Sequence, residues 1–421
     1  MNTQNKYSAL LFSTSYLDNA DANELAQLRD YIDQHDVKVG IVTNYLTSDT
    51  KKWLKTAPLR VDTWTCGGSI KESRHVWYRK PMPQVMSVTM GKLRKIRSEV
   101  LSVCWNDIDL EASEKAYIDC LMRPSPAELI PMLTDAPRAE TPAIDLSMPA
   151  PLTGVFGAMV GDMVGAPHEH KSGRTKNPKF KFKKDKWRST DDSVLTMAVA
   201  EWLMSDRSRE ALDRQFTIWC FAHYKCGFGH DFMNWLDSKE HGSRYATSNG
   251  AAMRVVPVGI AAKSLEECLE LADFQARMTH NSDEASNGAQ AIAACVFLTR
   301  TGKSKEEIKA YIEDTFKMDL NRTIQELRDG YDKDEPQNCN CLRCASEAII
   351  CWLQSDGYEQ TIRNSISLGG DADTIAAMAG GIAACTKGME IPQEIAEECY
   401  NLLSEDLKQT LITFENHYNN M

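Results

Sequence analysis

No apolar run in this chain of 421 residues approaches the roughly 18 residues needed to span a bilayer, so no transmembrane helix is expected. The first residues, MNTQNKYSALLF, carry one lysine and no sustained apolar stretch, and we therefore expect no secretory signal peptide. A disulfide framework is not expected either, because the 13 cysteines are an odd number scattered along a long chain. Together these absences favour a reducing, cytoplasmic location and no membrane contact.

Basic residues are in the minority: Lys and Arg total 48 against 59 Asp and Glu, which gives a formal net charge of −11. An acidic surface argues against general nucleic-acid binding, although a local basic patch could still act alone. At about 150 residues per domain, the length predicts two or three domains. The fractions of hydrophobic residues, 43%, and charged residues, 25%, are ordinary for a globular protein.

Proline is concentrated in one stretch, because seven of the 15 prolines fall between Pro124 and Pro151. Closely spaced prolines interrupt both helix and sheet, so we predict that residues 124–151 form an extended tether or a surface strap. This linker would separate an N-terminal domain, residues 1–123, from a C-terminal domain, residues 152–421. We detect no internal repeat.

The N-terminal segment alternates between strand and helix patterns. Ser8–Phe12, Val37–Asn44 and Val100–Trp105 are short, apolar, β-branched runs, and the stretch ELAQLRDYIDQ between the first two has helical spacing. Strand, helix and strand at this spacing predict a small Rossmann-like α/β domain with a parallel sheet.

The C-terminal segment has few strand-like runs, and its long periodic stretches predict a compact all-α domain. The clearest are VLTMAVAEWLM, LEECLELADFQARM, GAQAIAACVFLTR and EIAEECYNLLSEDLKQTLITF. Small residues recur at three- and four-residue steps on one face of two predicted helices, which lets neighbouring backbones approach closely. These residues are Gly154, Gly157, Gly161 and Gly165 in one helix and Ala376, Ala379, Gly380 and Ala383 in the other.

Carboxylates gather at the starts of two predicted helices, in the segments STDDS and GGDADT. A helix start stabilises negative charge, so each cluster alone could be a cap. A cap uses one side chain per helix, however, whereas here the aspartates come in pairs. If the helices pack together, the carboxylates repel one another, and the site calls for protons or cations. Oxygen ligands favour Mg²⁺, Mn²⁺ or Ca²⁺ and disfavour zinc. The aspartates are Asp191, Asp192, Asp371 and Asp373.

A basic loop, residues 170–188, carries nine Lys or Arg against one Asp. A solvated face is one interpretation. The other is that the loop rims a cleft and attracts a diphosphate or an acidic macromolecular substrate. Phe180 and Phe182 alternate with lysines in this loop and could either stack on a base or anchor the loop in the core.

Three thiols stand close together in the segment CNCLRC, at Cys339, Cys341 and Cys344. A zinc site needs a fourth ligand, which the sequence does not identify. The alternative is a set of free thiols on a loop before a helix.

Five motifs stand in the order found in the ADP-ribosylglycohydrolase family, which the chain resembles from Gly154 to about Pro392. They are GVFGAMVGDMVGAPHEH, STDDSVLTMAVAEWL, SNGAAMRVVPVGIAA, THNSDEASNGAQAIAA and SLGGDADTIAAMAGGIAAC. The resemblance implies an all-α fold with two divalent cations, Mg²⁺ or Mn²⁺. It also implies hydrolysis of a ribosyl C1 glycosidic bond, which releases ADP-ribose from an ADP-ribosylated protein or a small ADP-ribosyl compound. Nucleic acid is then expected only as a modified substrate.

The resemblance also assigns site residues by matching position. Glu169 matches the glutamate of a mobile loop and is the candidate general base, and catalytic roles are also expected for Asp192 and Asp371. The implied metal ligands are Thr190, Asp191 and Asp192 for one ion and Asp371, Asp373 and Thr374 for the other, with one aspartate bridging. The implied substrate-binding residues are Ser248, Asn249, Gly250, His280 and Gly370.

The first 120 or so residues resemble a small haloacid-dehalogenase-type domain that lacks its nucleophile. The matching residues are Thr43, Lys80 and Asp109. Where that family has an Asp-x-Asp motif after the first strand, this chain has Ser13 and Ser15, and Trp105 replaces a metal-binding aspartate. Without the nucleophile, phosphoryl transfer has nothing to start it. We therefore expect a binding or packing module, with a phosphatase as the alternative.

Two classes of function remain for the C-terminal segment. The first is a metal-dependent ADP-ribosylglycohydrolase, and the second is a non-catalytic ADP-ribose-binding or toxin-neutralising protein. Retention of all the implied ligands together with Glu169 favours catalysis. The sequence leaves open the linkage that is cleaved, the preferred ion, the oligomeric state and the role of the N-terminal domain.

Overall fold

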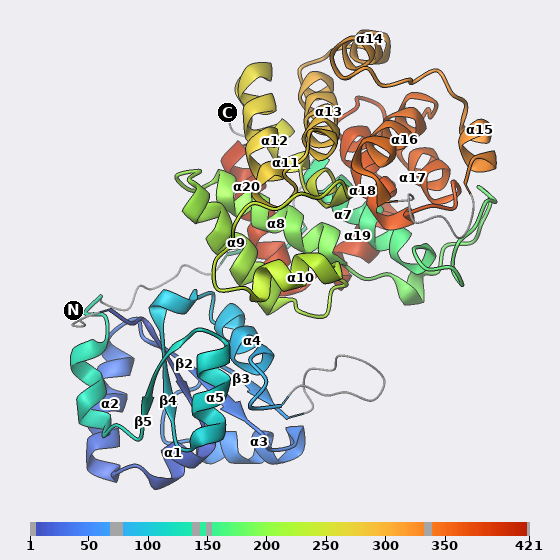
Figure 1. Cartoon of the computed structure of the whole chain (residues 1–421). Coiled ribbons are helices and arrows are strands. Elements are labelled where there is room, and N and C mark those ends of the chain that lie inside the picture. Colours follow the sequence, from blue (N-terminus) through green and yellow to red (C-terminus); the bar gives the residue numbers. More distant parts are fainter. Residues whose placement is uncertain (1–5, 68–78, 137–143, 149–153, 332–338, 419–421) are drawn as a thin grey trace. The chain divides into compact units, whose positions relative to one another are not determined.

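The computed structural model describes residues 6–67, 79–136, 144–148, 154–331 and 339–418. These residues fall into two compact units, one built mainly from the N-terminal part of the chain and one from the C-terminal part (Figure 1). Within the described ranges, no helix is both long and apolar enough to cross a membrane.

The N-terminal unit contains a five-stranded parallel sheet with the strand order β3-β2-β1-β4-β5. The central strand β1 is buried at all four positions. The four strand pairings are all parallel and helices lie between the strands in the chain, which confirms the predicted parallel α/β architecture. Two edge strands were not predicted, because β3 and β5 are short and half their residues or more are not fully buried. The strands are β1 (Ala9–Phe12), β2 (Lys38–Thr43), β3 (Thr63–Cys66), β4 (Val100–Cys104) and β5 (Asp119–Met122). The helices between them are α1 (Thr14–Asn19), α2 (Ala22–Gln34), α3 (Thr47–Trp53), α4 (Gln84–Lys92) and α5 (Asp107–Lys115).

The start of the proline-rich stretch is helical. It forms α6 (Pro126–Leu129) and a 3₁₀ turn (Ile130–Met132), and Leu129 and Leu133 are buried in the core of the N-terminal unit. Proline occupies the first turn of both elements, where its missing N–H breaks no helical hydrogen bond. The prediction of an extended tether is therefore wrong for residues 126–132. Residues 137–143 and 149–151 of this stretch lie outside the described residues.

The C-terminal unit is mostly helical, as predicted. The long stretch EIAEECYNLLSEDLKQTLITF is divided between two helices, α19 and α20. The first helices of this part of the chain are α7 (Gly154–Gly165), α8 (Asp191–Leu203), α9 (Arg209–Ala222), α10 (His230–Asp237), α11 (Val256–Ala261), α12 (Leu265–Thr279) and α13 (Asp283–Arg300). The C-terminal unit contains α9 up to Phe216 and α10 up to Trp235. The others are α14 (Lys305–Phe316), α15 (Ile324–Asp329), α16 (Cys341–Leu353), α17 (Tyr358–Ile366), α18 (Ala372–Ala384), α19 (Gln393–Leu402) and α20 (Glu405–Tyr418).

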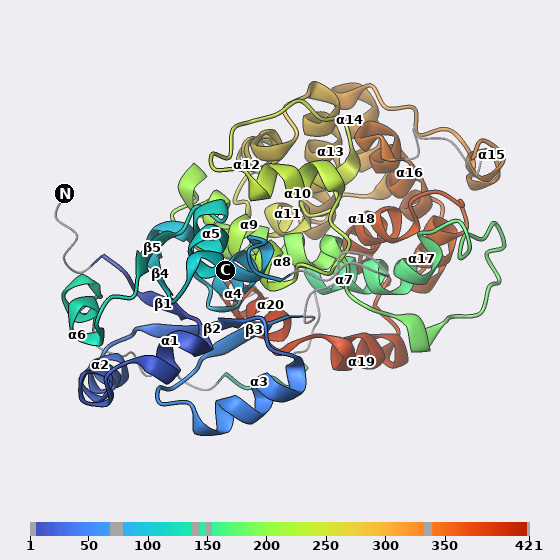
Figure 2. The same ribbon diagram turned by 60° about the horizontal axis from the view of Figure 1, so that its bottom comes forward.

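Helices α7 and α18 lie side by side in the middle of the C-terminal unit (Figures 1 and 2). Their predicted small-residue faces meet. A Cβ added at Gly157 would lie 2.6 Å from the carbonyl oxygen of Gly380, and one at Gly161 would lie 2.1 Å from that of Ala376. Only glycine allows the two backbones to come this close. The packing brings the end of α7 beside the acidic start of α18.

Candidate active site

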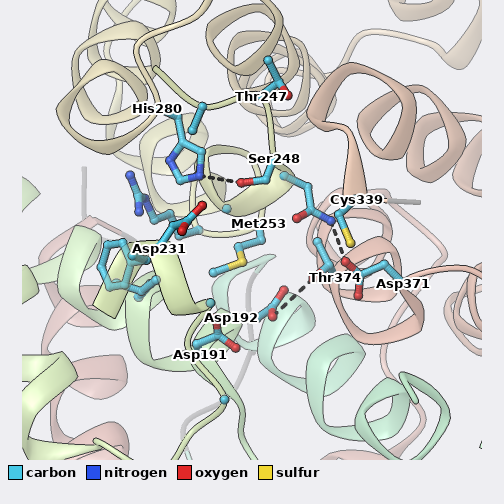
Figure 3. Close-up of a pocket in the computed structure, with 18 of the residues that line it drawn as sticks. Asp191, Asp192, Asp231, Thr247, Ser248, Met253, His280, Cys339, Asp371 and Thr374 are labelled. Carbon is cyan, nitrogen blue, oxygen red and sulfur yellow. Dashed lines mark hydrogen bonds between the residues drawn. The ribbon is translucent and has the colours of Figure 1, made fainter. Parts of the chain in front are cut away.

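The two acidic clusters lie at helix starts and meet in one place. The Thr190 hydroxyl caps α8 by accepting the N–H of Asp192 at 3.4 Å, and Asp371 occupies the N-cap position of α18. The Thr374 hydroxyl of α18 donates to Asp192 Oδ2 at 3.4 Å. Figure 3 shows Asp191, Asp192, Thr374 and Asp371 around one cavity. The convergence on which the predicted metal site depends is therefore present in the structure.

A further carboxylate at this place, Asp162 of α7, was not predicted. It is fully buried and accepts the backbone N–H groups of Thr190 at 3.0 Å and Ser193 at 3.2 Å. The side-chain hydroxyls of Thr190 and Ser193 also donate to the Asp162 carboxylate, and the Thr190 hydrogen bond is 2.6 Å long. Asp162 thereby ties the first turn of α8 to α7. The available signal was a lone aspartate in the apolar, glycine-rich helix GVFGAMVGDMVG.

Three buried carboxylates form a group that could hold a metal ion. Asp162, Asp192 and Asp373 each offer an oxygen, and these atoms lie within 4.8 Å of one another. The Asp192 Oδ1 atom is buried without a hydrogen-bond partner. Burying a carboxylate in this way is costly unless a cation or a proton compensates its charge. The donor set is all oxygen, so the residues present fit a hard divalent cation such as Mg²⁺ or Mn²⁺.

The electrostatics of the cluster point the same way. Burial, reinforced by the neighbouring charge of Asp162, raises the pKa of Asp191 to about 8. Burial and the neighbouring aspartates also raise the pKa of Asp192 and Asp373 well above the ordinary value. Without a cation, Asp191 is therefore mostly protonated at neutral pH, protonation is also favoured at Asp192 and Asp373, and a bound cation would take the place of these protons.

Most of the predicted site residues line a single cleft of about 640 Å³ within the C-terminal unit. Thr190 does not line it and is bonded instead to Asp162. Gly370 also lies outside the lining, against the ring of Tyr331, where an added Cβ would be 2.3 Å from Cε1. The predicted residues in the lining are Glu169, Asp191, Asp192, Ser248, Asn249, Gly250, His280, Asp371, Asp373 and Thr374.

Glu169 follows a 3₁₀ turn (Ala166–His168) at the end of α7, and its side chain is 32% exposed. Its carboxylate lies 3.9 Å from Nη2 of Arg188 and 3.5 Å from Nδ1 of His170. Its backbone oxygen accepts Nε–H of Arg174 at 3.0 Å. Glu169 is therefore a cleft carboxylate that water can reach and that basic side chains surround.

The other wall of the cleft carries neutral hydrogen-bonding groups. His280 Nε2 lies 2.9 Å from Ser248 Oγ, and its Nδ1 lies 2.7 Å from Thr279 Oγ1 (Figure 3 shows the first contact). Burial, helped by the Arg254 charge, lowers the pKa of His280 to about 3, so the imidazole is neutral. Asn249 Nδ2 donates to Asp371 Oδ2 at 2.8 Å and joins this wall to the acidic cluster.

The two phenylalanines of the basic loop are packed against other side chains. The Phe180 ring lies 4.7 Å from that of His168 and 5.6 Å from that of Phe182, which in turn contacts Trp187 at 5.8 Å. This packing supports the anchoring interpretation over base stacking. Among the described residues that line the cleft, none is a lysine of this loop.

The thiols of CNCLRC do not come together as a zinc site in the part of the chain that the structure describes. Cys341 and Cys344 are buried at the start of α16, whereas Cys339 is exposed and lines the cleft near Asp371 (Figure 3). Among the described residues, the side chains that are grouped closely enough to hold a metal ion are those of Asp162, Asp192 and Asp373. The interpretation as free thiols is therefore favoured, but their predicted place on a loop before the helix is wrong for Cys341 and Cys344, which lie within α16.

In the N-terminal unit, the residues that resemble phosphatase positions lie at the carboxyl ends of the strands. The Lys80 ammonium forms a buried ion pair with Asp109, and the Thr14 and Thr43 hydroxyls are 3.2 Å apart. The cavity beside Ser13 measures about 10 Å³, which has room for about one water molecule. This closed geometry favours a packing module over a phosphatase, and the haloacid-dehalogenase resemblance stays a prediction.

Comparison with known proteins identifies the class of the C-terminal unit. The model of the ADP-ribosylglycohydrolase family matches residues 152–419, more than half of the chain, and the chain therefore belongs to this family. The ADP-ribosylhydrolase ARH3 of Mus musculus is 26% identical over 279 residues, covering 52% of this chain and 75% of the mouse protein. The ADP-ribosyl-[dinitrogen reductase] glycohydrolase of Rhodospirillum rubrum is 25% identical over 214 residues, covering 48% of this chain and 69% of that protein. A solved "ADP-ribosylglycohydrolase-related protein complex" aligns with a TM-score of 0.46 at 22% identity, over 62% of this chain and 96% of that one.

Proposed function

We propose that this protein is a metal-dependent hydrolase of the ribosyl C1 glycosidic bond, which releases ADP-ribose from an ADP-ribosylated protein or a small ADP-ribosyl compound. Membership of the family supports hydrolysis of an ADP-ribose linkage. The observation that carries the metal dependence is the buried group of Asp162, Asp192 and Asp373 at the edge of a cleft that also contains Glu169 and Asp371.

The chemistry follows from the residue types. Glycoside cleavage passes through an oxocarbenium-like state and needs a placed water and an activated carboxylate. When bound, divalent cations supply an acidified water and orient hydroxyl groups of a sugar. The residues that would hold such ions lie at the starts of two helices: Thr190, Asp191 and Asp192 at α8, and Asp371, Asp373 and Thr374 at α18. Asp162 of α7 would add a further oxygen beside Asp192 and Asp373. The metal-free geometry positions these groups without assigning each one to a particular ion.

Glu169 is the proposed general base, because its carboxylate lines the cleft and is open to water. It takes a proton from the attacking water as the C1 bond breaks and the leaving group departs with the bonding electron pair. Ser248, Asn249, Gly250 and His280 form the wall opposite and are proposed to orient the ADP-ribose. Gly370 supports this site through its packing on Tyr331 rather than by lining the cleft.

The first test is a panel of ADP-ribosylated proteins, ADP-ribosylated nucleic acids and small ADP-ribose esters, each incubated with Mg²⁺ or Mn²⁺ while free ADP-ribose is measured. Release from one linkage class defines the substrate. Saturable binding of ADP-ribose without release from any substrate would instead support the non-catalytic alternative.

Asp371→Asn is expected to lower the rate of ADP-ribose release by about a hundredfold or more, because it removes a charge beside the metal group and weakens the contact with Asn249. The matched control is Asp314→Asn, which changes the charge equally at a side chain that is 88% exposed. Thermal unfolding of both variants checks the fold. Release at the parental rate by the Asp371 variant contradicts the catalytic assignment.

A further inference from the structure

The basic loop that follows Glu169 presents lysines over a layer of packed rings. We call residues 171–188 the basic strap. Lys179, Lys181 and Lys186 are exposed, whereas Phe180 and Phe182, which alternate with the first two, are half-buried. These three lysines are therefore more open to solvent than the two rings.

Packing with other parts of the C-terminal unit holds the strap in place. The guanidinium of Arg363 lies 5.2 Å from the centre of the Phe180 ring and 4.1 Å from that of Phe182. The same guanidinium donates to the Phe180 carbonyl oxygen at 2.7 Å. Lys176 Nζ donates to the carbonyl oxygens of Arg328 at 2.6 Å and Tyr331 at 2.8 Å. The segment that carries the exposed residues Lys179, Lys181 and Lys186 is therefore held in place by these contacts.

The positive charge of the strap is only partly compensated. Lys184 is paired with Glu394, but across the described ranges no ion pair involves Lys179, Lys181 or Lys186. The whole chain carries a net charge of −11, so this concentration of cations runs against the average of the protein. Such a patch attracts a partner of negative charge.

Both ends of the strap adjoin Glu169, which lines the cleft. Its first residue is separated from Glu169 by one position, and at its other end Arg188 Nη2 lies 3.9 Å from Glu169 Oε2. Arg174, within the strap, donates to the Glu169 backbone oxygen at 3.0 Å. Two basic side chains of the strap, those of Arg174 and Arg188, therefore contact the proposed general base, whereas the exposed lysines lie outside the cleft lining.

The chemistry of the strap distinguishes between polyanions. Surfaces that bind single-stranded nucleic acid combine positive charge with aromatic rings that are free to stack on bases. Here the rings of Phe180 and Phe182 are packed against Trp187, His168 and Arg363. We propose that the basic strap docks an acidic polypeptide segment beside the ADP-ribosylated residue of a protein substrate. The identity of the substrate rests on the proposed function, whereas the docking itself requires no turnover.

The test measures binding of a short fluorescein-labelled polyglutamate peptide to the full-length protein by fluorescence anisotropy at low and high salt. The triple variant Lys179→Gln, Lys181→Gln, Lys186→Gln should bind roughly tenfold more weakly, the scale expected for three exposed charge contacts. The matched control is Lys51→Gln, Lys52→Gln, Lys55→Gln, which removes equal charge from exposed positions outside the strap and should bind like the parent. All proteins should bind free ADP-ribose equally.

Binding of an oligo(dT) probe tests the alternative that the strap binds nucleic acid. Equal peptide affinity for the triple variant and the parent, or no peptide binding by the parent, overturns the proposal. Tighter binding of oligo(dT) than of the peptide, lost in the same triple variant, also overturns it and assigns the strap to nucleic acid. A protein that releases no ADP-ribose but shows the expected peptide result would refute the proposed function and leave the docking surface standing.

Discussion

At the scale of single residues, the centre of the site is a carboxylate that does not line the cleft. Asp162 receives two backbone N–H groups and two hydroxyls from Thr190 and Ser193. All four groups are hydrogen-bond donors, so both oxygens of the side chain at position 162 must act as acceptors. We assign Asp162 to positioning the acidic turn of α8, in addition to the oxygen that it offers to the metal group with Asp192 and Asp373.

Asp162→Asn should lower the free energy of unfolding by about 1–3 kcal/mol, because the new amide N–H₂ faces donors and leaves buried groups unsatisfied. It should also weaken Mn²⁺ binding through displacement of Thr190 and Asp192. Urea unfolding and calorimetric titration with Mn²⁺ measure the two effects, with Asp314→Asn as the control. Parental values for both quantities would show that Asp162 does not position this turn.

Single residues also show which parts of the site could be predicted from the sequence. The acidic pairs were visible because N-caps and first-turn carboxylates are local signals. Asp162 was missed because its partners Thr190 and Ser193 lie 28 and 31 positions away. The role of Phe180 was ambiguous for the same reason, since the guanidinium that contacts it belongs to Arg363, 183 positions along the chain.

At the scale of elements, the site is made by the packing of α7 against α18. Each helix could be predicted from its periodicity, and the glycine spacing indicated that close neighbours were needed. The pairing of α7 with α18 could not be predicted, because the two helices are far apart in the sequence. In the proline-rich stretch, the sequence predicted an extended chain where the structure has short helices. The prolines there occupy first-turn positions, which a helix tolerates. The edge strands β3 and β5 have only four residues each and no clear alternation of buried and exposed positions, so the sequence did not reveal them.

Gly161→Ala tests the packing of these helices. Its new Cβ would lie 2.1 Å from the Ala376 carbonyl oxygen, so the helices must separate, and we expect a loss of about 1–3 kcal/mol of unfolding free energy together with weaker metal binding. Gly357→Ala is the control, because no atom lies within 4 Å of the Cβ it would add. Chemical denaturation and metal titration give the readouts. Equal stability of the two variants would contradict the proposed close contact.

At the scale of the whole molecule, the buried carboxyls link stability to pH and to metal. The pKa of Asp191 is about 8 in the fold, against the ordinary value of 3.8 for an aspartate, and the pKa values of Asp192 and Asp373 are also raised. Between the two pKa values of Asp191, 3.8 and about 8, the folded protein holds more protons than the unfolded chain. Its stability without metal therefore falls as pH rises, by about 1.4 kcal/mol per pH unit for each proton of difference.

We predict that the EDTA-treated protein becomes less stable from about pH 5 to pH 8, and that Mg²⁺ or Mn²⁺ flattens this slope because cations replace the protons. Urea unfolding at several pH values, with and without each ion, measures the effect. A metal-free stability that rises over this range, or an identical slope with ions present, would contradict the cation interpretation.

The main-chain contact between α7 and α18 has a consequence for how the family can diversify. Where backbone touches backbone, interhelical spacing does not depend on the size of neighbouring side chains. Exposed side chains away from this contact, such as Lys179, Lys181 and Lys186, can therefore vary while the spacing of α7 and α18, which places the acidic cluster, stays the same.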